Sequence, residues 1–483
     1  MPAPTPIRRT GRACVIGAGP NGLAAAIVLA QAGMEVEVFE AESQPGGAVR
    51  TMELTLPGFH HDFGSAVHPL GIGSPFFQSL PLKNYGLEWI HSPAPLAHPL
   101  DDGTAVILER DLATADAALG SDGLAWRSLM QPFVTRWDDL TDDILQPILH
   151  WPRHPLLIAR FGLRGLQPAG FVARRRFRGD QSRALFAGLA AHSCLALNQP
   201  FTTSFAMVLG VAAHAVGWPI PRGGAQSLTN ALAGYLAHLG GRITLNTRIR
   251  KLSDLPACDL MMCDITPRQL LALTGEPQPA ALTPSYRRRL ADYKYGPAAF
   301  KVDFALSRPI PWNAPACLRA AAVHVGGSLA EIEASEAAMA SGHTAARPFV
   351  LVAQPTLFDP SRAPEGKHIA WAYCHVPYAS TDDMLDRIES QIERFAAGFR
   401  ATILARHASS PATLEAADAN LIGGDIGGGA VNPRQLLFRP TRRHYRTSSP
   451  NIYLCSCSTP PGGGVHGMCG ANAARMALRD HPH

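Results

Sequence analysis

The strongest constraint on the fold is a glycine-rich turn near the start of the chain, with the sequence GAGPNG. The apolar residues 13–16 before this turn predict a buried strand, and the alanine-rich residues 20–31 after it predict a helix. A second short strand, residues 35–39, ends on the acidic Glu40. Strand, glycine turn, helix, strand and acid in this order predict a βαβ unit that binds a dinucleotide.

The residues of the turn have separate physical roles. Gly17 permits the tight turn, Gly19 lets a pyrophosphate approach the backbone, and Gly22 lets the helix pack closely on the strand. Pro20 and Asn21 open the helix, whose free N–H groups would hold the phosphate. Glycine turns also occur for packing alone, which is the alternative interpretation of this triplet.

The residues from Glu40 onward distinguish between dinucleotides. The Glu40 carboxylate can accept both ribose hydroxyls of an adenosine, and it would repel the 2′-phosphate of NADP. Gly46 and Gly47 then form a second glycine turn, and Arg50 follows where its guanidinium can hold the same pyrophosphate bidentately. An ordinary loop is the other interpretation of the glycine pair. Acid, glycine pair and arginine in this order resemble the FAD-binding signature of the amine oxidase and phytoene desaturase superfamily.

Two further segments carry this resemblance, which implies how they contact FAD. In GFHHDFGSAVHPL the backbone is expected to run alongside the flavin ring at Gly64, Ser65, Ala66 and Val67. Residues 241–252, GRITLNTRIRKL, predict an alternating strand that passes the adenine, with the contact expected at Arg248 and Ile249.

The C-terminal segment is similar to the terminal flavin motif of the same superfamily. Residues 452–455 predict a buried strand, and an alanine-rich helix follows from Met468. The start of this helix would direct N–H donors at the flavin C2 carbonyl, with His466, Gly467 and Met468 best placed. Ser458 stands where amine oxidases usually have an acid, which puts ribityl binding by that side chain in doubt. The alternative interpretation is a glycine loop packed under the first strand.

Two residues are nominated for catalysis, His466 and Lys301. Residues 295–312 begin a strand in which Lys301 and Asp303 face one side, and three apolar residues of this strand face the other. Amine oxidases hold a lysine near the flavin N5 through a water, and the resemblance implies that Lys301 is its counterpart. The other interpretation is a structural lysine paired with Asp303.

The length and the order of these motifs predict two domains in an α/β fold, because 483 residues exceed what one core usually supports. We expect a Rossmann-type FAD domain made of residues 1–70, 216–290 and 446–483. A discontinuous α+β substrate domain would comprise residues 71–215, mostly helical, and 291–445. Pro93, Pro95 and Pro99 are expected to mark loops, and residues 381–407 to form one long amphipathic helix.

Composition excludes several other classes of protein. A net charge of +5 gives no sign of a nucleic-acid partner, and the sequence has no run of eighteen apolar residues to span a membrane. The N-terminal residues do not resemble a signal peptide, so a cytoplasmic location is expected. The spacing of Cys258 and Cys263 is that of disulfide reductases, but in a strand it would put the two thiols on opposite faces. No metal site is expected at the histidines of residues 60–68.

Residues 151–178 interleave apolar residues with seven arginines and contain no acid. Such a segment can lie on an anionic membrane surface, as a peripheral contact. A solvated basic face with buried apolar flanks is the more common structure. Both interpretations stay open at this point.

Together the segments resemble the bacterial phytoene desaturase-like FAD oxidoreductases over nearly the whole chain. The resemblance implies an FAD-dependent dehydrogenase, desaturase or oxidase that takes a hydride from a C–H or C–N bond of a small, apolar substrate onto the flavin N5. Oxygen or a quinone would accept the electrons. Two alternatives remain: an FAD-dependent isomerase or cyclase without net redox change, and a non-enzymatic, FAD-stabilised binding protein.

Overall fold

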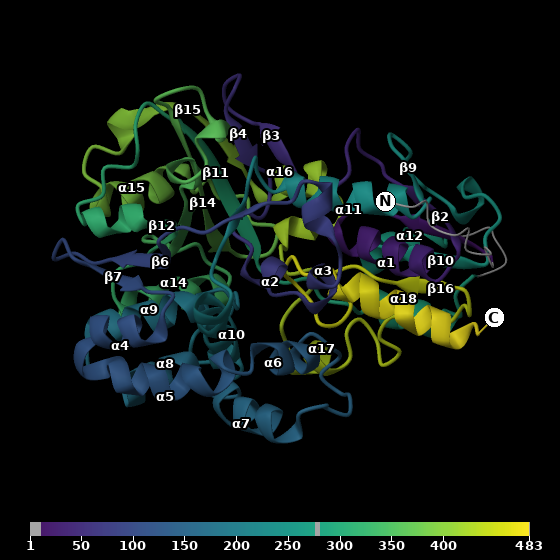
Figure 1. Cartoon of the computed structure of the whole chain (residues 1–483), viewed down its shortest axis with the longest axis horizontal. Coiled ribbons are helices and arrows are strands. Elements are labelled where there is room, and N and C mark those ends of the chain that lie inside the picture. The colour runs from purple at the N-terminus through teal and green to yellow at the C-terminus, as the bar shows by residue number, and fades with distance from the viewer. Residues whose placement is uncertain (1–10, 276–280, 483) are drawn as a thin grey trace.

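A parallel five-stranded sheet and a larger mixed sheet organise the chain in the computed structural model, which describes residues 11–275 and 281–482 (Figure 1). The parallel sheet has the strand order β16-β10-β1-β2-β9. Its strands come from distant parts of the sequence: β1 (Arg12–Ile16), β2 (Glu35–Phe39), β9 (Arg242–Thr244), β10 (Leu260–Cys263) and β16 (Ile452–Leu454). The predicted strand 241–252 is therefore much shorter than expected, and Asn246, at φ +53°, lies just beyond its end.

Helices cover both faces of this sheet. Side chains alternate along the strands, so that Val15 and Met262 face one apolar cluster and Met261 and Cys263 face another. The first cluster holds α1 (Pro20–Gln31), α11 (Gln226–His238) and α18 (Met468–Asp480); the second holds α12 (Pro267–Leu273) and α13 (Pro284–Ala291). This doubly covered parallel sheet confirms the predicted Rossmann-type domain.

The second sheet has seven strands in the order β15-β11-β14-β13-β12-β6-β7 and is antiparallel except where β12 meets β6. The strands are β6 (Ala94–Pro99), β7 (Ala105–Leu108), β11 (Ala298–Leu306), β12 (Ala320–Val325), β13 (Val350–Ala353), β14 (His368–Val376) and β15 (Ile403–Ser409). Short pairs join β3 (Thr51–Glu53) to β4 (His60–Asp62) and β5 (Trp89–Ile90) to β8 (Ile220–Pro221).

Two expectations about these segments were wrong. Residues 94–99 are strand β6 and not a loop, because pairing with β7 begins only at Leu96 and Pro99 is the last residue of the strand. Prolines near strand ends remove few ladder hydrogen bonds. The long helix expected over residues 381–407 is only α15 (Leu385–Phe395), followed by Gly398 at φ +85° and then β15.

Helices pack on both sides of the seven-stranded sheet. α15 joins the apolar cluster on one side, against Phe300, Val302 and Phe304. The helices that contribute to the cluster on the other side are α4 (Leu112–Ala118), α5 (Gly123–Val134), α6 (Trp137–Ile144), α7 (Pro155–Gly165), α8 (Ala169–Arg176), α9 (Asp180–Ala191), α10 (Thr202–Ala215), α14 (Leu329–Ala340) and α16 (Pro411–Ala417). Short helices complete the chain: α2 (Pro69–Ile72), α3 (Pro75–Gln78) and α17 (Pro433–Leu437).

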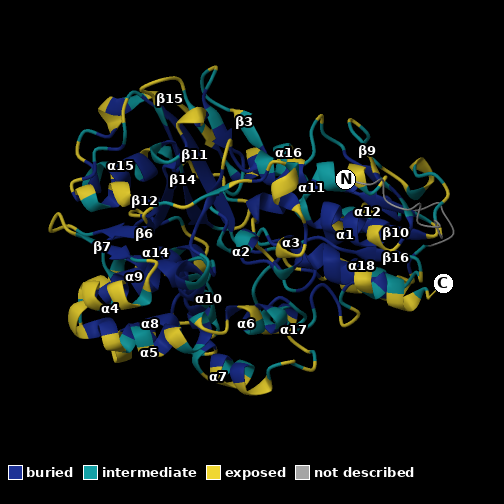
Figure 2. Cartoon of the chain, in the orientation of Figure 1, coloured by how far each residue is buried: buried dark blue, intermediate teal, exposed yellow. Residues whose placement is uncertain are grey.

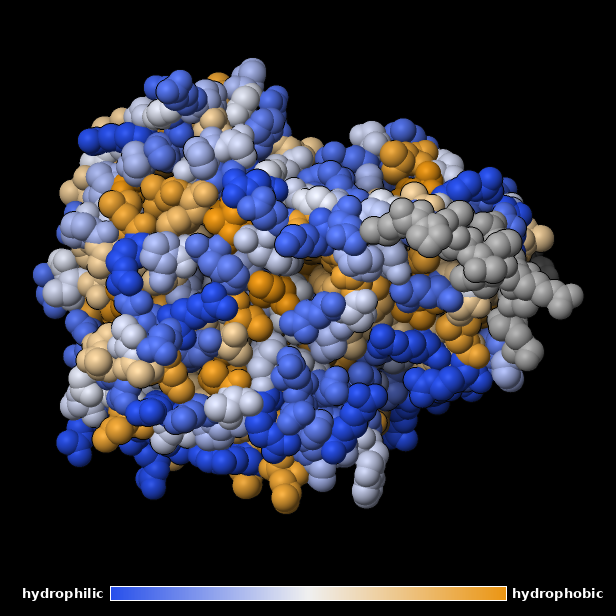
Figure 3. Space-filling view, viewed as in Figure 1, coloured by the Kyte–Doolittle hydropathy of each residue, from blue (hydrophilic) through white to orange (hydrophobic). Residues whose placement is uncertain are grey.

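The molecule has a buried centre and an outer layer of partly exposed helices. Figure 2 shows α1 and the centre of both sheets buried, while exposed residues gather on the outer helices. Figure 3 shows hydrophobic side chains that project from the lower edge of the molecule, the edge at which Figure 1 places α7. Within the described residues, no helix is long and apolar enough to cross a membrane.

The first and last helices of the parallel domain pack at unusually close range. A Cβ atom built on Gly470 of α18 would lie 1.8 Å from the backbone oxygen of Asn21 in α1. On the other side of α1, a Cβ on Gly22 would lie 2.0 Å from the oxygen of Gly17. Helix α1 is therefore held between the first turn and α18 at a distance that only glycine permits.

We expect Gly470→Ala to destabilise the protein, since the added methyl would have to push two helices apart, at a cost of about 1–3 kcal/mol or more. Thermal unfolding and retention of the bound cofactor on gel filtration measure the effect. Gly162→Ala in α7 is the matched control, because a Cβ there meets no atom within 4 Å. An equal Tm for the Gly470→Ala variant and wild type would contradict the close helix contact.

Candidate cofactor site and substrate face

The first glycine turn and Glu40 form one hydrogen-bonded unit. Gly17 has φ +95°, and Gly19 caps the N-terminus of α1 with Pro20 in its first position. The buried Glu40 carboxylate at the end of β2 accepts hydrogen bonds from the N–H groups of Ala18 at 2.7 Å and Glu42 at 3.0 Å. The acid predicted to bind a ribose thus lies directly beside the turn.

Sequence reasoning missed Asp264, which also lies at this turn. It follows β10, and its Oδ2 accepts a hydrogen bond of 2.8 Å from the N–H of Gly22. A Cβ on Gly19 would come within 2.8 Å of the same oxygen. Burial, with the nearby charges of Asp418 and Glu40, raises the pKa of Asp264 to about 8. The start of α1 therefore donates an N–H group to an oxygen of an acid, the type of contact predicted there for a phosphate. The sequence did contain a signal for Asp264, because this acid directly follows a predicted buried strand, and ligands of such sheets bind at the carboxyl ends of the strands.

The second glycine turn lies against the first. The N–H of Gly46 donates to the oxygen of Ala18 at 2.9 Å, and a Cβ on Gly47 would be 3.6 Å from the Cα of Gly19. Arg50 donates to the backbone oxygens of Gly47 at 2.7 Å and Ala417 at 2.8 Å. The structure thus brings the predicted glycine pair and arginine to the predicted diphosphate position.

The segment predicted to follow the flavin ring runs beside this arginine. The N–H of Phe63 donates to the oxygen of Arg50 at 2.8 Å, and a Cβ on Gly64 would lie 2.4 Å from the oxygen of Ala48. Ala66 is buried, the Ser65 hydroxyl makes a weak bond of 3.5 Å to the Val67 oxygen, and the Val67 side chain enters an apolar cluster.

The predicted adenine segment lies at the opposite end of the site. The N–H of Thr247 donates to the backbone oxygen of Glu40 at 2.7 Å, and the Arg248 guanidinium lies 3.4 Å from the Glu42 carboxylate. Ile249 packs against the apolar cluster under the parallel sheet. These residues adjoin the expected ribose position, although they follow β9 and are not part of a strand.

The C-terminal motif meets the first helix, as its close packing requires. Gly467 has φ +67°, and a Cβ there would lie 2.6 Å from the Phe77 ring. The N–H of Met468 donates to Nδ1 of His466 at 3.0 Å. Burial lowers the pKa of His466 to about 4, so the ring is neutral and carries its proton on Nε2. Ser458 is buried and donates to the oxygen of Gly428 at 2.8 Å.

His466 is therefore a hydrogen-bond donor and not a base in this arrangement. Its Nε2 is buried and makes no hydrogen bond of good geometry within the described part of the chain, although the backbone of Gly462 and Gly463 lies near the ring. A buried donor without a partner is costly unless a bound group accepts its proton. Together with the two adjacent glycine turns and the start of α1, this donor fits a dinucleotide that carries an acceptor ring.

Lys301 is a buried residue of β11 that lies in a polar network with Asp303. Its ammonium group forms an ion pair with Asp303, as one interpretation of the sequence anticipated. Burial lowers the pKa of Lys301 and raises that of Asp303 to about 6, against the attraction between the two charges. His61 Nδ1 lies 3.6 Å from Asp303, and burial with the charge of Lys301 lowers the pKa of His61 to about 3.

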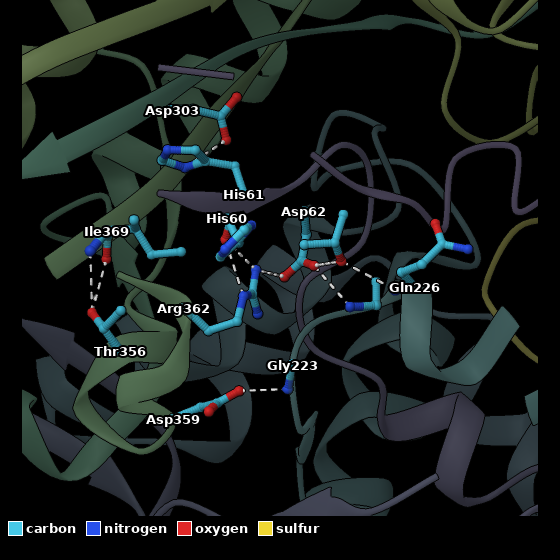
Figure 4. A network of polar contacts seen from close by, with 12 residues as sticks. His60, His61, Asp62, Gly223, Gln226, Asp303, Thr356, Asp359, Arg362 and Ile369 are labelled. Atoms are coloured by element: carbon cyan, nitrogen blue, oxygen red, sulfur yellow. Dashed lines mark hydrogen bonds and ion pairs between the residues drawn. The ribbon is translucent and has the colours of Figure 1, made fainter. Parts of the chain in front are cut away.

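Arg362 extends this network to the parallel domain, and sequence reasoning missed it. Its guanidinium donates to the backbone oxygen of His60 at 3.0 and 2.7 Å and lies 3.0 Å from the Asp62 carboxylate. Asp62 also accepts from the Thr51 hydroxyl at 2.9 Å and the Ala225 N–H at 2.8 Å. These contacts tie β4 and the start of α11 to the loop that carries Arg362 (Figure 4).

The cysteines and histidines singled out in the sequence form no other centre. Cys258 and Cys263 are both free thiols, and only Cys263 belongs to β10. Across residues 11–275 and 281–482, no three His, Cys, Asp or Glu side chains are arranged to hold a metal ion.

Comparison with known proteins identifies the family that shares this geometry. The family described as flavin containing amine oxidoreductase matches residues 21–471. The chain belongs to this family. The flavin-containing amine oxidoreductases include FAD-dependent oxidases and desaturases, so the protein is an FAD-dependent oxidoreductase, and the predicted cofactor and superfamily are confirmed.

Known relatives of this FAD-dependent oxidoreductase extend over nearly the whole chain. It is 28% identical to mouse (Mus musculus) pyridine nucleotide-disulfide oxidoreductase domain-containing protein 2, over 97% of this chain and 93% of that protein. It is 25% identical to the lycopene-forming phytoene desaturase of Pseudescherichia vulneris, over 96% and 98% of the two chains. The structure of cyclohexylamine oxidase from Brevibacterium oxydans superimposes with a TM-score of 0.60 at 14% identity, over 98% and 100% of the chains, which shows a shared fold.

We expect Asp264→Asn to stabilise the flavin-free form of this FAD-dependent oxidoreductase at neutral and alkaline pH. Because the native pKa of about 8 lies above the ordinary value of 3.8, the folded protein holds a proton that the unfolded chain releases. Wild-type stability should therefore fall as pH rises between these two values, and the asparagine removes this loss. Tm measured across that range checks the expectation.

Asp383→Asn, at an exposed carboxylate, is the control and should leave the pH dependence unchanged. A Tm difference between the Asp264→Asn variant and wild type that shrinks with rising pH would contradict the buried, protonated Asp264.

Proposed function

We propose that the protein oxidises a C–H or C–N bond of a small, apolar molecule where the seven-stranded sheet meets the segment that follows β4. FAD, when bound, accepts the hydride from the substrate carbon, and oxygen or a quinone takes the two electrons onward. The protein contributes orientation, exclusion of water and fixed charges.

The main observation in favour of an apolar substrate is the apolar cluster that includes the predicted flavin segment. Val67 and Leu70 of that segment share one apolar cluster with Trp371 and Tyr373 of β14. The two aromatic rings meet edge to face with their centroids 5.0 Å apart. Apolar and aromatic side chains with few polar groups are typical of a site for a hydrophobic molecule.

Fixed charge at this face comes from the buried pair of Lys301 and Asp303. The Lys301 ammonium lies 5.7 Å from the centroid of the Trp371 ring, so the cation borders the aromatic surface. We propose that Lys301 orients the reacting molecule or a bound water. His466 would donate from Nε2 to the C2 carbonyl side of the flavin, where negative charge gathers on reduction.

The curated relatives support an apolar substrate. Phytoene desaturases act on a hydrocarbon by their name, and they match this chain at 24–25% identity along nearly its whole length, whereas the solved cyclohexylamine oxidase is 14% identical. We therefore place desaturation or dehydrogenation of a C–H bond ahead of amine oxidation.

The visible spectrum of the purified protein, followed by chromatography of the released cofactor, is the first test, and we expect one FAD per chain. Anaerobic mixing with isoprenoids and with amines should then bleach the flavin with the true substrate only. A substrate that is converted while the flavin stays oxidised would replace this proposal with an isomerase or cyclase. A flavin that resists dithionite would indicate a binding protein.

A second prediction separates chemistry from structure at Lys301. Lys301→Met alone should lower the Tm, since it leaves the Asp303 carboxylate buried without its cation, at a cost of about 3–5 kcal/mol. The double variant Lys301→Met/Asp303→Leu replaces the pair by apolar side chains and should largely restore the Tm. If Lys301 assists the reaction, anaerobic flavin reduction by the bleaching compound stays about tenfold or more slower in the double variant.

The control for this experiment is Lys367→Met, which removes an exposed lysine. A double variant with wild-type Tm and a reduction rate constant like that of wild type would show that Lys301 has a structural role alone.

A further inference from the structure

The exposed surface of α7 and of the loop before it is apolar to a degree that soluble surfaces rarely show. The side chains of Trp151, Leu156 and Leu163 are 93%, 85% and 75% exposed, and Ile148 and Leu149 are each more than half exposed. Single exposed apolar residues need no explanation, but a cluster of large ones marks a contact surface. We call residues 148–178 the basic apolar face.

Helical spacing explains why these residues point outward together. Leu156, Arg160 and Leu163 recur at the separations that place side chains on one side of α7. On the opposite side of the same helix, Leu157 and Phe161 are buried in the apolar cluster under the mixed sheet. Helix α7 is therefore apolar on both sides, and its inner side alone accounts for its packing.

The next helix supplies charge beside this apolar surface. Phe171, Arg174, Arg175 and Arg178 are all exposed, at the spacing of one side of α8 and the residues after it. An open groove of about 530 Å³ is lined by Phe171, Arg174 and Arg175 together with Pro168, Gly170, Asn198 and Glu333. Arg174 pairs with Glu333 in this groove, which leaves Phe171 and the Arg175 guanidinium to meet an anionic head group attached to an apolar chain.

The distribution of charge over the whole chain points the same way. Residues 151–178 contain seven arginines and no acid, while the chain as a whole carries +5, so the remaining residues sum to −2. Arg153 and Arg174 have acidic partners, Asp142 and Glu333. Within the described ranges, no ion pair involves Arg160 or the three exposed arginines 175, 176 and 178.

We propose that the basic apolar face docks the protein on an anionic lipid bilayer. Trp151, Leu156 and Leu163 would enter the boundary between head groups and acyl chains, where tryptophan and leucine of amphipathic helices lie. The unpaired arginines would lie at the level of the lipid phosphates. Another protein is a weaker candidate for the occupant, because the exposed apolar residues lie in a segment with seven arginines and no acid, a charge that an anionic lipid surface complements.

Flotation of the FAD-loaded, full-length protein with vesicles tests the proposal without any turnover. The probes are vesicles of phosphatidylcholine alone and of phosphatidylcholine mixed equally with phosphatidylglycerol. We expect binding to the anionic vesicles, and much weaker binding to the neutral ones or at high salt. The triple variant Trp151→Ala/Leu156→Gln/Leu163→Gln should lose at least ~90% of this binding.

A matched pair of variants isolates the charge. Arg175→Gln/Arg176→Gln should weaken partition to anionic vesicles about 30-fold, the equivalent of about 1 kcal/mol per arginine. Arg288→Gln/Arg289→Gln removes two adjacent exposed arginines of α13 and should change little. Leu318→Gln/Leu404→Gln is the corresponding control for exposed apolar residues elsewhere.

All variants replace exposed side chains, so their Tm values and bound flavin should match wild type, which separates docking from folding. Three results would overturn the proposal. The first is equal binding to neutral and anionic vesicles, or to neither. The second is equal loss of binding in the control variants. The third is a dimer in solution that the triple variant dissociates, which would show a second copy of the chain on this face.

Discussion

The contact between α1 and α18 is the constraint on which the rest of the structure depends. It exists because Gly470 and Gly22 present no side chain on the two sides of α1, so that α18 and the first turn both reach its backbone. This contact places His466 and Met468 beside a helix that begins more than 440 residues earlier in the chain. Without it, the parts of the cofactor site would remain in separate segments.

The buried network around Asp62 and Arg362 adds a second constraint, which concerns position more than stability. Buried ion pairs recover little net free energy, because removing the charges from water offsets their attraction. Their directional contacts, however, fix the position of β4: Arg362 donates to the His60 backbone and pairs with Asp62, and His61 lies beside Asp303 of β11. The segment after β4 therefore has a defined position relative to Lys301.

Much of the cofactor site was predictable because its residues are local. The first turn, Glu40, the glycine pair and Arg50 lie within about 35 residues, and short motifs of this kind follow from backbone geometry alone. The C-terminal helix was predictable for the same reason. Asp264 and Arg362 were missed because each acts on a distant segment, and a single acid after a strand or a single arginine in a loop has no local pattern.

The misjudged elements have a related cause. Proline is uncommon in strands because it has no backbone N–H to donate. Near the ends of β6 the prolines remove few ladder hydrogen bonds, and the sequence alone does not show where pairing with β7 begins. In residues 381–407 the helical spacing of apolar residues correctly indicated α15. The prediction gave too little weight to Gly398, which follows the helix, and to the alternating pattern of β15. Neither error reached the cofactor site.

The alanine-rich surface of α1 has a consequence for synthesis of the protein. Every residue from Asn21 to Ala30 is buried, and α18 provides much of that cover. A growing chain that has not yet emerged as far as residue 480 would display this small, smooth helix face uncovered on the ribosome. Assembly of the nucleotide domain must therefore wait until α18, which is translated long after α1, has emerged, and until then the α1 surface lacks its partner.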